Sequence, residues 1–113
     1  NCLNDDVNVR FIQACLWDLP DISADWGFCT DVMEHIPMGR VQDVVRGIAA
    51  RVKACYFNIA TRDDVGGSLI GRKLHMTVMG GPDWVRLLSM HFADVRVTNE
   101  TEGEITLVAR HAN

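Results

Sequence analysis

The sequence predicts an α/β domain in which parallel strands alternate with helices and an antiparallel hairpin ends the sheet. Short runs rich in β-branched and aromatic residues alternate with segments whose apolar residues recur at helical spacing, the pattern of parallel α/β proteins. Near the C-terminus, residues 94–98 and 105–110 alternate between apolar and polar side chains, and a turn with Gly103 joins them. The chain of 113 residues fits one small domain, residues 1–113.

Three earlier strands are expected. Residues 9–14 form a short apolar stretch with β-branched and aromatic side chains, and regular structure stops at Pro20. Residues 25–30 and 54–60 are apolar on both sides of the chain. This pattern suits central parallel strands that helices cover on both faces of the sheet.

Two helices are expected from stripes of apolar residues. The stripe of the first helix consists of Val41, Val44, Val45, Ile48, Ala49 and Val52. Arg51 near its end suits the negative pole of the helix dipole. Pro82 opens the second helix, whose stripe includes Trp84. The connector at 61–81 is glycine-rich and long, and long connectors are often lids or binding loops.

Composition and charge exclude several classes of function. The net charge of −4 leaves no basic face for nucleic acid. No apolar run approaches the roughly 18 residues that span a bilayer, and the N-terminus has no signal-peptide pattern, so we expect a cytoplasmic protein without membrane association. No histidine or cysteine pair has zinc-ligand spacing, so no metal site is expected. The residues expected to be buried free thiols are Cys2, Cys15, Cys29 and Cys55.

Two blocks of the sequence carry a resemblance to a known enzyme family. Residues 25–37 read Asp-Trp-Gly-Phe-Cys-Thr-Asp-Val-Met-Glu-His-Ile-Pro, and residues 14–20 read Ala-Cys-Leu-Trp-Asp-Leu-Pro. The first block resembles the fourth strand and the following Asp-Val-Leu-Glu-His-Ile motif of the class I, Rossmann-like S-adenosylmethionine-dependent methyltransferases. The second resembles the end of the third strand of that family. The resemblance implies a truncated Rossmann-like sheet, which is the C-terminal half of a methyltransferase domain, with S-adenosylmethionine as the cofactor.

The resemblance also implies roles for residues near the carboxyl ends of the strands. Those expected beside the cofactor are Cys15, Leu16, Trp17, Cys29 and Thr30. Glu34 and Asn58 would contact the methyl acceptor, and His75 would close over it as a catalytic residue. His35 is expected either to position or deprotonate the acceptor or to close the turn before Pro37. The family commonly has an acidic residue where Cys15 stands, and cysteine is a poor hydrogen-bond acceptor.

The glycine-rich turn that holds the cofactor in this family has no counterpart in the sequence. Gly66-Gly67 and Gly80-Gly81 lack its spacing and its strand-to-helix setting. In the family, two strands lie between the third and fourth strands, so residues 1–19 are expected to be loosely held or paired differently. We therefore expect weak or no activity in this form.

Three hypotheses for function follow. The first is methyl transfer from S-adenosylmethionine to a small-molecule or unknown acceptor by the parent protein. The second is a non-catalytic interaction module that associates through exposed sheet edges, including as a homo-oligomer. The third is a fragment of a nicotinamide-dependent Rossmann enzyme, which the closing hairpin and the Glu-His-Ile block disfavour.

Overall fold

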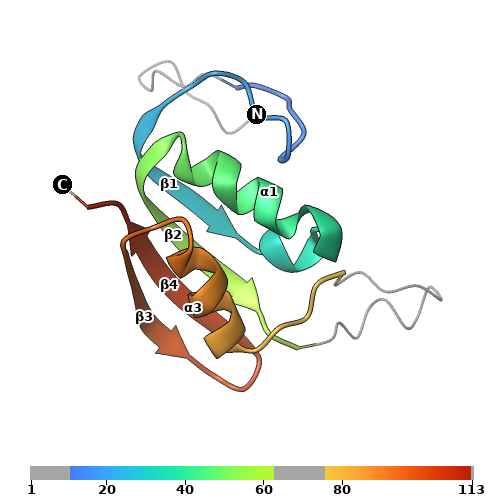
Figure 1. Cartoon of the computed structure of the whole chain (residues 1–113). Helices are drawn as coiled ribbons and strands as arrows, with labels where there is room; N and C mark the ends of the chain where they lie inside the picture. Colours follow the sequence, from blue (N-terminus) through green and yellow to red (C-terminus); the bar gives the residue numbers. More distant parts are fainter. Residues whose placement is uncertain (1–10, 63–75, 113) are drawn as a thin grey trace, which may run out of the picture.

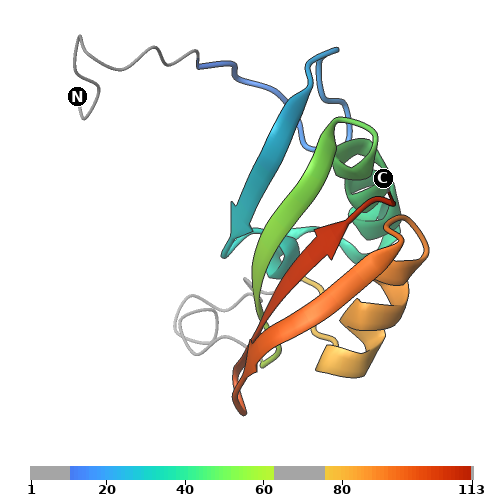
Figure 2. The ribbon, with the colours of Figure 1, turned by 90° about the vertical axis from the view of Figure 1, so that its left-hand side faces the viewer.

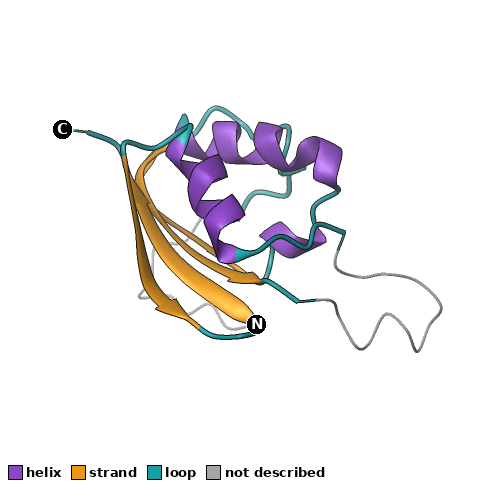
Figure 3. Ribbon diagram, turned by 60° about the horizontal axis from the view of Figure 1, so that its bottom comes forward, coloured by secondary structure: helices purple, strands orange, loops and turns teal. Residues whose placement is uncertain are grey.

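The computed structural model describes residues 11–62 and 76–112. Its elements are, in chain order, β1 (Ala24–Thr30), the 3₁₀ helix η1 (Met33–His35), α1 (Met38–Ala49), β2 (Val52–Ala60), α3 (Gly81–Ser89), β3 (Asp94–Glu100) and β4 (Glu104–Arg110). The strands form one sheet in the order β1-β2-β4-β3 (Figure 1). The helices all lie on the same face of this sheet (Figure 3).

The sheet is parallel on one side and antiparallel on the other. β1 pairs with β2 in parallel, with Phe28 opposite Tyr56 and Cys29 opposite Phe57. β4 runs antiparallel to both of its neighbours, β2 and β3. Because parallel neighbours need a crossover connection, α1 spans the distance from the end of β1 back to the start of β2. The predicted α/β class, with parallel strands and a terminal antiparallel hairpin, is confirmed.

The two α-helices form where the apolar stripes predict them. The residues of α1 that are buried are Val41, Val44, Val45 and Ala49. α3 has Pro82 in its first turn, where a missing backbone N–H costs no hydrogen bond, and it buries Trp84 and Leu88. Val52, expected as the last residue of the first stripe, is instead the first residue of β2, because α1 ends at Ala49.

The hydrophobic core lies between the helices and the face of the sheet that they cover. Phe57 in β2, Leu107 in β4 and Trp84 in α3 are fully buried there. Phe92, which follows α3, stands edge-on to Phe57 with the ring centroids 6.3 Å apart. Burial of one such side chain contributes about 1.5–3 kcal/mol, so these contacts between distant segments hold α3 and the hairpin against β2.

The strand expected at residues 9–14 is wrong for the part that the structure describes. Residues 11–14 have no regular structure, and positions 9 and 10 lie outside the described residues. The segment leads into a tight turn, in which the Asp18 N–H donates to the Cys15 carbonyl at 3.0 Å. A strand needs a neighbour for its N–H and C=O groups, and none of the described strands pairs with this segment.

β1 is an edge strand among the described residues, and the expectation of a central strand covered on both faces is wrong (Figure 2). Its partner in the sheet is β2. Phe28 is 78% exposed and Trp26 is 47% exposed. Both alternate along β1 with the buried Cys29 and therefore lie on the opposite face of the sheet, which carries no helix. The apolar composition of β1 predicted burial, but burial requires a covering element, and the described residues supply one for the other face.

Candidate functional site

The parallel strands β1 and β2 end at the same edge of the sheet, and this places the predicted residues Thr30 and Asn58 side by side. Directly after β1, Asp31 has a φ of 56°, a left-handed conformation that few residues besides glycine, asparagine and aspartate adopt. Its N–H donates to the Asn58 carbonyl at 3.1 Å, so the chain turns sharply at this edge and enters η1. Ligands of open α/β sheets bind beyond the carboxyl ends of the strands.

Glu34, predicted to contact the acceptor, lies inside the protein. The residue is 1% exposed, and its Oε1 accepts a hydrogen bond from the Ala60 N–H at 3.2 Å. Oε2 is buried and has no hydrogen-bond partner in the described part of the chain. The carboxyl group therefore ties η1 to the last residue of β2, and any effect of Glu34 on an acceptor would be indirect.

Thr77 belongs to the same edge, although no motif in the sequence points to it. It is fully buried, and its N–H donates to the Glu34 carbonyl at 3.1 Å. Its Oγ1 donates to the Ile36 carbonyl at 2.6 Å. These two bonds hold the segment before α3 against η1. A single polar residue within a glycine-rich connector has no periodicity that could have revealed this role.

Asn58 is fixed within the sheet, His35 lies at the surface, and His75 lies outside the described residues. The Asn58 amide Nδ2 donates to Thr106 Oγ1 at 2.9 Å, which fixes its orientation within the sheet. His35 is exposed at the end of η1, and its backbone N–H donates to the Val32 carbonyl at 2.9 Å. His75 lies outside the described residues, as does most of the expected connector. The roles of all three remain predictions.

The predicted cofactor residues 15–17 form the tip of a turn beside α1. Cys15 is exposed, so the expectation of a buried thiol is wrong at this position. Trp17 is 40% exposed, and the Arg40 guanidinium lies 5.3 Å from its ring centroid, a cation–π contact. Leu16 is partly buried and packs against the core. The three neighbours therefore point into different surroundings.

An apolar pocket of about 310 Å³ connects this turn with β1. Its lining includes Leu16, Ile22, Cys29, Val32, Ile48 and Cys55. Of the predicted cofactor residues, the pocket brings together Leu16 and Cys29, whereas Cys15, Trp17 and Thr30 do not line it. Concave, mostly apolar pockets are the usual places for small ligands and cofactors.

The two thiols in this pocket are neutral at physiological pH. Burial, and after it the charge of Glu34, raises the pKa of the Cys29 thiol to about 12. Burial, and after it the proximity of Cys29, raises the pKa of the Cys55 thiol to about 12 as well. The thiolate is the reactive form of cysteine, so both side chains act as apolar lining rather than as nucleophiles. Both are buried free thiols, as predicted.

The described ranges, 11–62 and 76–112, contain no group of three or more His, Cys, Asp and Glu side chains that could hold a metal ion. Within the same ranges, no helix has the length and apolar character that crossing a membrane requires. The edge at Thr30 and Asn58 and the adjoining apolar pocket are candidate places for a ligand in this part of the chain.

Comparison with protein-family models and with curated proteins finds no match to this sequence. Solved structures do match its fold. The N-terminal domain of EvdMO1 with SAH bound has a TM-score of 0.67 at 14% identity, over 88% of this chain and 52% of that one. The magnesium protoporphyrin IX methyltransferase ChlM from Synechocystis PCC 6803 with bound SAH has a TM-score of 0.64 at 16% identity, over 90% and 50%.

Human N-acetylserotonin methyltransferase in complex with SAM has a TM-score of 0.69 at 15% identity, over 91% of this chain and 34% of that one. The chain thus spans about half, or less, of the length of these similar structures. At such low identities the likeness concerns the fold alone. The described residues therefore have the fold of the class I methyltransferases, in the form of a partial, mixed α/β sheet.

Proposed function

We propose that this chain is part of an enzyme that transfers the methyl group of S-adenosylmethionine (SAM) to a small-molecule acceptor. The observation that carries the proposal is the fold, which is shared with structures that hold SAM or its product SAH. Two of these proteins are named for small-molecule acceptors, magnesium protoporphyrin IX and N-acetylserotonin.

The apolar pocket fits the adenine side of such a cofactor. Adenine is uncharged and flat, and the pocket offers it Leu16, Val32 and the neutral thiol of Cys29. Thr30 follows Cys29 at the carboxyl end of β1, where the rest of the cofactor would lie. When bound, SAM supplies an electrophilic methyl group on a sulfonium. The described residues contribute no glycine-rich turn to hold its amino-acid end.

The residues on the acceptor side would act mainly by alignment. Methyl transfer depends on holding the acceptor atom close to and in line with the methyl group. His35, exposed at this edge, is the described side chain that would accept a proton from the acceptor. Glu34 would act indirectly, because it is buried and fixes the end of β2 and the segment at Thr77.

The remainder of the fold would meet this chain along β1. Phe28 is exposed beside Tyr56, with the ring centroids 5.9 Å apart, and Arg110 lies over the exposed ring of Trp26. Parallel strands are normally covered on both faces, so this aromatic face favours a partner that supplies both a strand for the β1 edge and a helix for the face. A second copy paired edge to edge would extend the sheet but leave the aromatic face bare.

Calorimetric titration with SAH tests the proposal. The 113-residue chain is compared with a polypeptide that also carries any sequence encoded before it. We expect binding by the longer polypeptide, and weaker or no binding by the chain alone. Leu16→Asp should abolish binding because it places a charge in the apolar pocket, whereas Val97→Asp, at an exposed position of β3, should leave it unchanged.

The absence of SAH binding in both polypeptides would overturn the enzyme proposal. The exposed aromatic face and the open edge of β1 would then favour the interaction module. Sedimentation of the chain at several concentrations shows whether a second copy of the chain or a different partner covers that surface. A dimer that Phe28→Asp dissociates would identify a second copy, and a monomer would indicate a different partner.

A further inference from the structure

Arg51, in the turn between α1 and β2, binds three main-chain carbonyl groups at once. Nε donates to the Pro20 carbonyl at 2.8 Å, Nη2 to the Leu19 carbonyl at 2.8 Å and Nη1 to the Gly47 carbonyl at 2.9 Å. The first two acceptors belong to the loop before β1, and the third belongs to α1. The planar guanidinium group, with several N–H donors in a rigid fork, is suited to joining two segments in this way.

The loop also approaches α1 at Gly47, where the helix has no side chain. A Cβ on Gly47 would lie 3.9 Å from the Leu19 Cδ1 atom and 3.8 Å from Arg51 Nη1. An alanine at this position would therefore make ordinary van der Waals contact with both Leu19 and Arg51. A side chain larger than alanine at this position would push Leu19 away from the helix.

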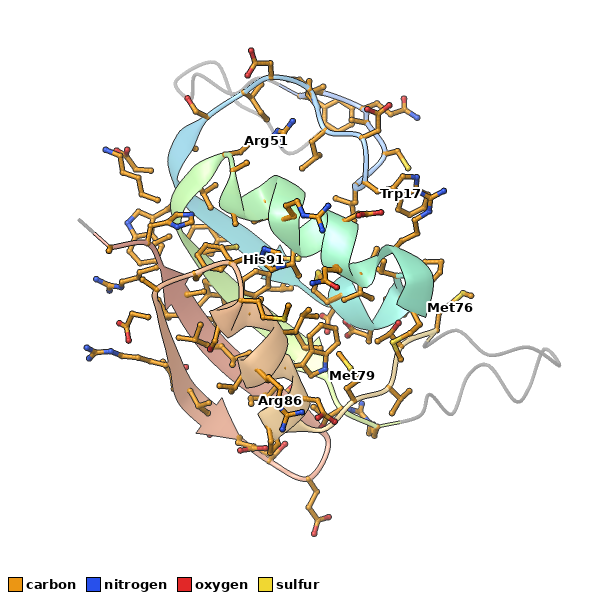
Figure 4. All side chains as sticks on the ribbon, viewed as in Figure 1. Trp17, Arg51, Met76, Met79, Arg86 and His91 are labelled. Atoms are coloured by element: carbon orange, nitrogen blue, oxygen red, sulfur yellow. The ribbon has the colours of Figure 1, made fainter. Side chains whose placement is uncertain are left out.

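The turn at 15–18, at the N-terminal end of this loop, is held more weakly. Trp17 is 40% exposed, and its contact is the cation–π contact with Arg40. Arg40 itself is exposed on the first turn of α1, so water competes for both partners. The bonds of Arg51 are charge-assisted and half-buried, which makes them the stronger attachment of the two. Figure 4 shows Arg51 beside the loop that carries Trp17.

We propose that Arg51 is a positioning residue for the cofactor site. Arg51 itself lines the apolar pocket, and by binding the carbonyls of Leu19 and Pro20 it holds the turn at 15–18 beside α1 and keeps Leu16 in the pocket wall. The sequence pattern alone indicated for Arg51 a favourable charge at the helix end. The inference rests on the proposed function, because it assigns the pocket to the adenine side of SAM.

The first test measures the order of the loop without any ligand. In a Trp26→Phe background, Trp17 is the exposed tryptophan and Trp84 is buried, so acrylamide quenching reports on Trp17. We expect Arg51→Ala to increase quenching of Trp17 and to speed hydrogen exchange of the Asp18 amide, which donates to the Cys15 carbonyl. Arg46→Ala is the matched control, because Arg46 is exposed on the same helix and binds Asp43.

Two conservative changes separate positioning from a general effect on stability. Arg51→Lys keeps the charge but lacks the fork, so we expect it to leave Trp17 as accessible as Arg51→Ala does. Guanidinium chloride, added to Arg51→Ala well below denaturing concentration, should restore protection of Trp17 by occupying the vacated site. The proposal would be overturned if Arg51→Lys showed no more quenching of Trp17 than the unaltered chain, or if Arg51→Ala left the quenching of Trp17 unchanged.

The second test measures SAH affinity in the polypeptide that binds it. We expect Arg51→Ala to weaken binding roughly tenfold or more, the effect of losing about one charge-assisted hydrogen bond, and Arg46→Ala to leave it unchanged. A loosened Trp17 with unaltered SAH affinity would overturn the assignment of this loop to the cofactor site. If the unaltered protein binds no SAH, the proposed function fails. The quenching of Trp17 then decides by itself whether Arg51 holds the loop.

Discussion

The strands β1 and β4 each have seven residues in the same sheet, yet they differ greatly in burial. In β4, Ile105, Leu107 and Ala109 are fully buried, whereas Cys29 is the buried residue of β1. β4 lies between β2 and β3, and β1 has a described neighbour on one side. The difference teaches that the strands beside a strand and the helices over its face, and not its apolar content, determine how much of it is buried.

The largest expected effect comes from truncating one apolar side chain in each strand. Leu107→Ala removes a fully buried side chain and leaves a cavity, so we expect the free energy of unfolding to fall by about 2–5 kcal/mol. Phe28→Ala removes a side chain that is 78% exposed, so we expect a change within about 0.5 kcal/mol. Urea denaturation followed by circular dichroism measures both changes.

A large fall in the free energy of unfolding on Phe28→Ala would contradict the comparison between β1 and β4. It would mean that something covers β1 in solution, because an exposed side chain has little to lose on truncation. Repeating the measurement at several protein concentrations then shows whether the cover is a second copy of the chain, since only that cover depends on concentration.

A smaller effect is expected at the ends of the parallel strands, where Glu34 replaces a strand neighbour as the partner of the Ala60 N–H. Glu34→Ala leaves that buried N–H without an acceptor and should cost about 1–3 kcal/mol of unfolding free energy. Glu34→Gln keeps an oxygen for the Ala60 N–H and should cost less. Thermal or urea unfolding of both variants measures the difference.

Equal losses in Glu34→Gln and Glu34→Ala would contradict this account. They would show that the second carboxylate oxygen, which has no hydrogen-bond partner among the described residues, contributes to stability through its charge. They would also remove the reason to treat Glu34 as a structural tie of the edge rather than as a residue that faces a ligand.

The smallest expected effect concerns the contact between α1 and the end of α3. Burial, and after it the charge of Arg46, lowers the pKa of His91 from its ordinary value of 6.5. The neutral imidazole is therefore favoured in the folded protein. Its contribution to stability is present above pH 6.5 and is lost as the pH falls through 6.5 toward the lowered pKa of the folded state.

His91→Gln should remove this part of the pH dependence. The urea midpoint of the unaltered chain should fall more steeply between about pH 7.5 and about pH 5.5 than that of the variant. Arg46→Ala should also reduce the slope, because it removes one cause of the lowered pKa. An unchanged slope in His91→Gln would assign the pH dependence to other groups.

Local periodicity predicted most elements of the fold. The apolar stripe of α1, Pro82 at the start of α3 and the alternating residues of the hairpin all mark elements that the structure contains. These signals are reliable because each arises from residues a few positions apart, whose spacing must match the repeat of a helix or strand. The same reasoning wrongly extended to residues 9–14, where apolar composition is present but no described strand pairs.

The candidate site was predicted less completely than the fold. The sequence places Thr30 and Asn58 at strand ends, and the register of β1 and β2 brings them together. No local pattern shows that Arg51 reaches back to Leu19 and Pro20, because those partners lie 32 and 31 positions away. Likewise, the burial of Thr77 depends on η1, which no periodicity connects to it.

By itself, the sequence determined the class of the fold, the positions of the helices and the strand ends at which a ligand site is expected. Only the tertiary structure decided that β1 is an edge strand, that its aromatic side chains are exposed, and that Leu16 and Cys29 line one pocket. The physical reason is that secondary structure follows from the repeat of the backbone, whereas exposure and pocket walls depend on which distant segments pack together.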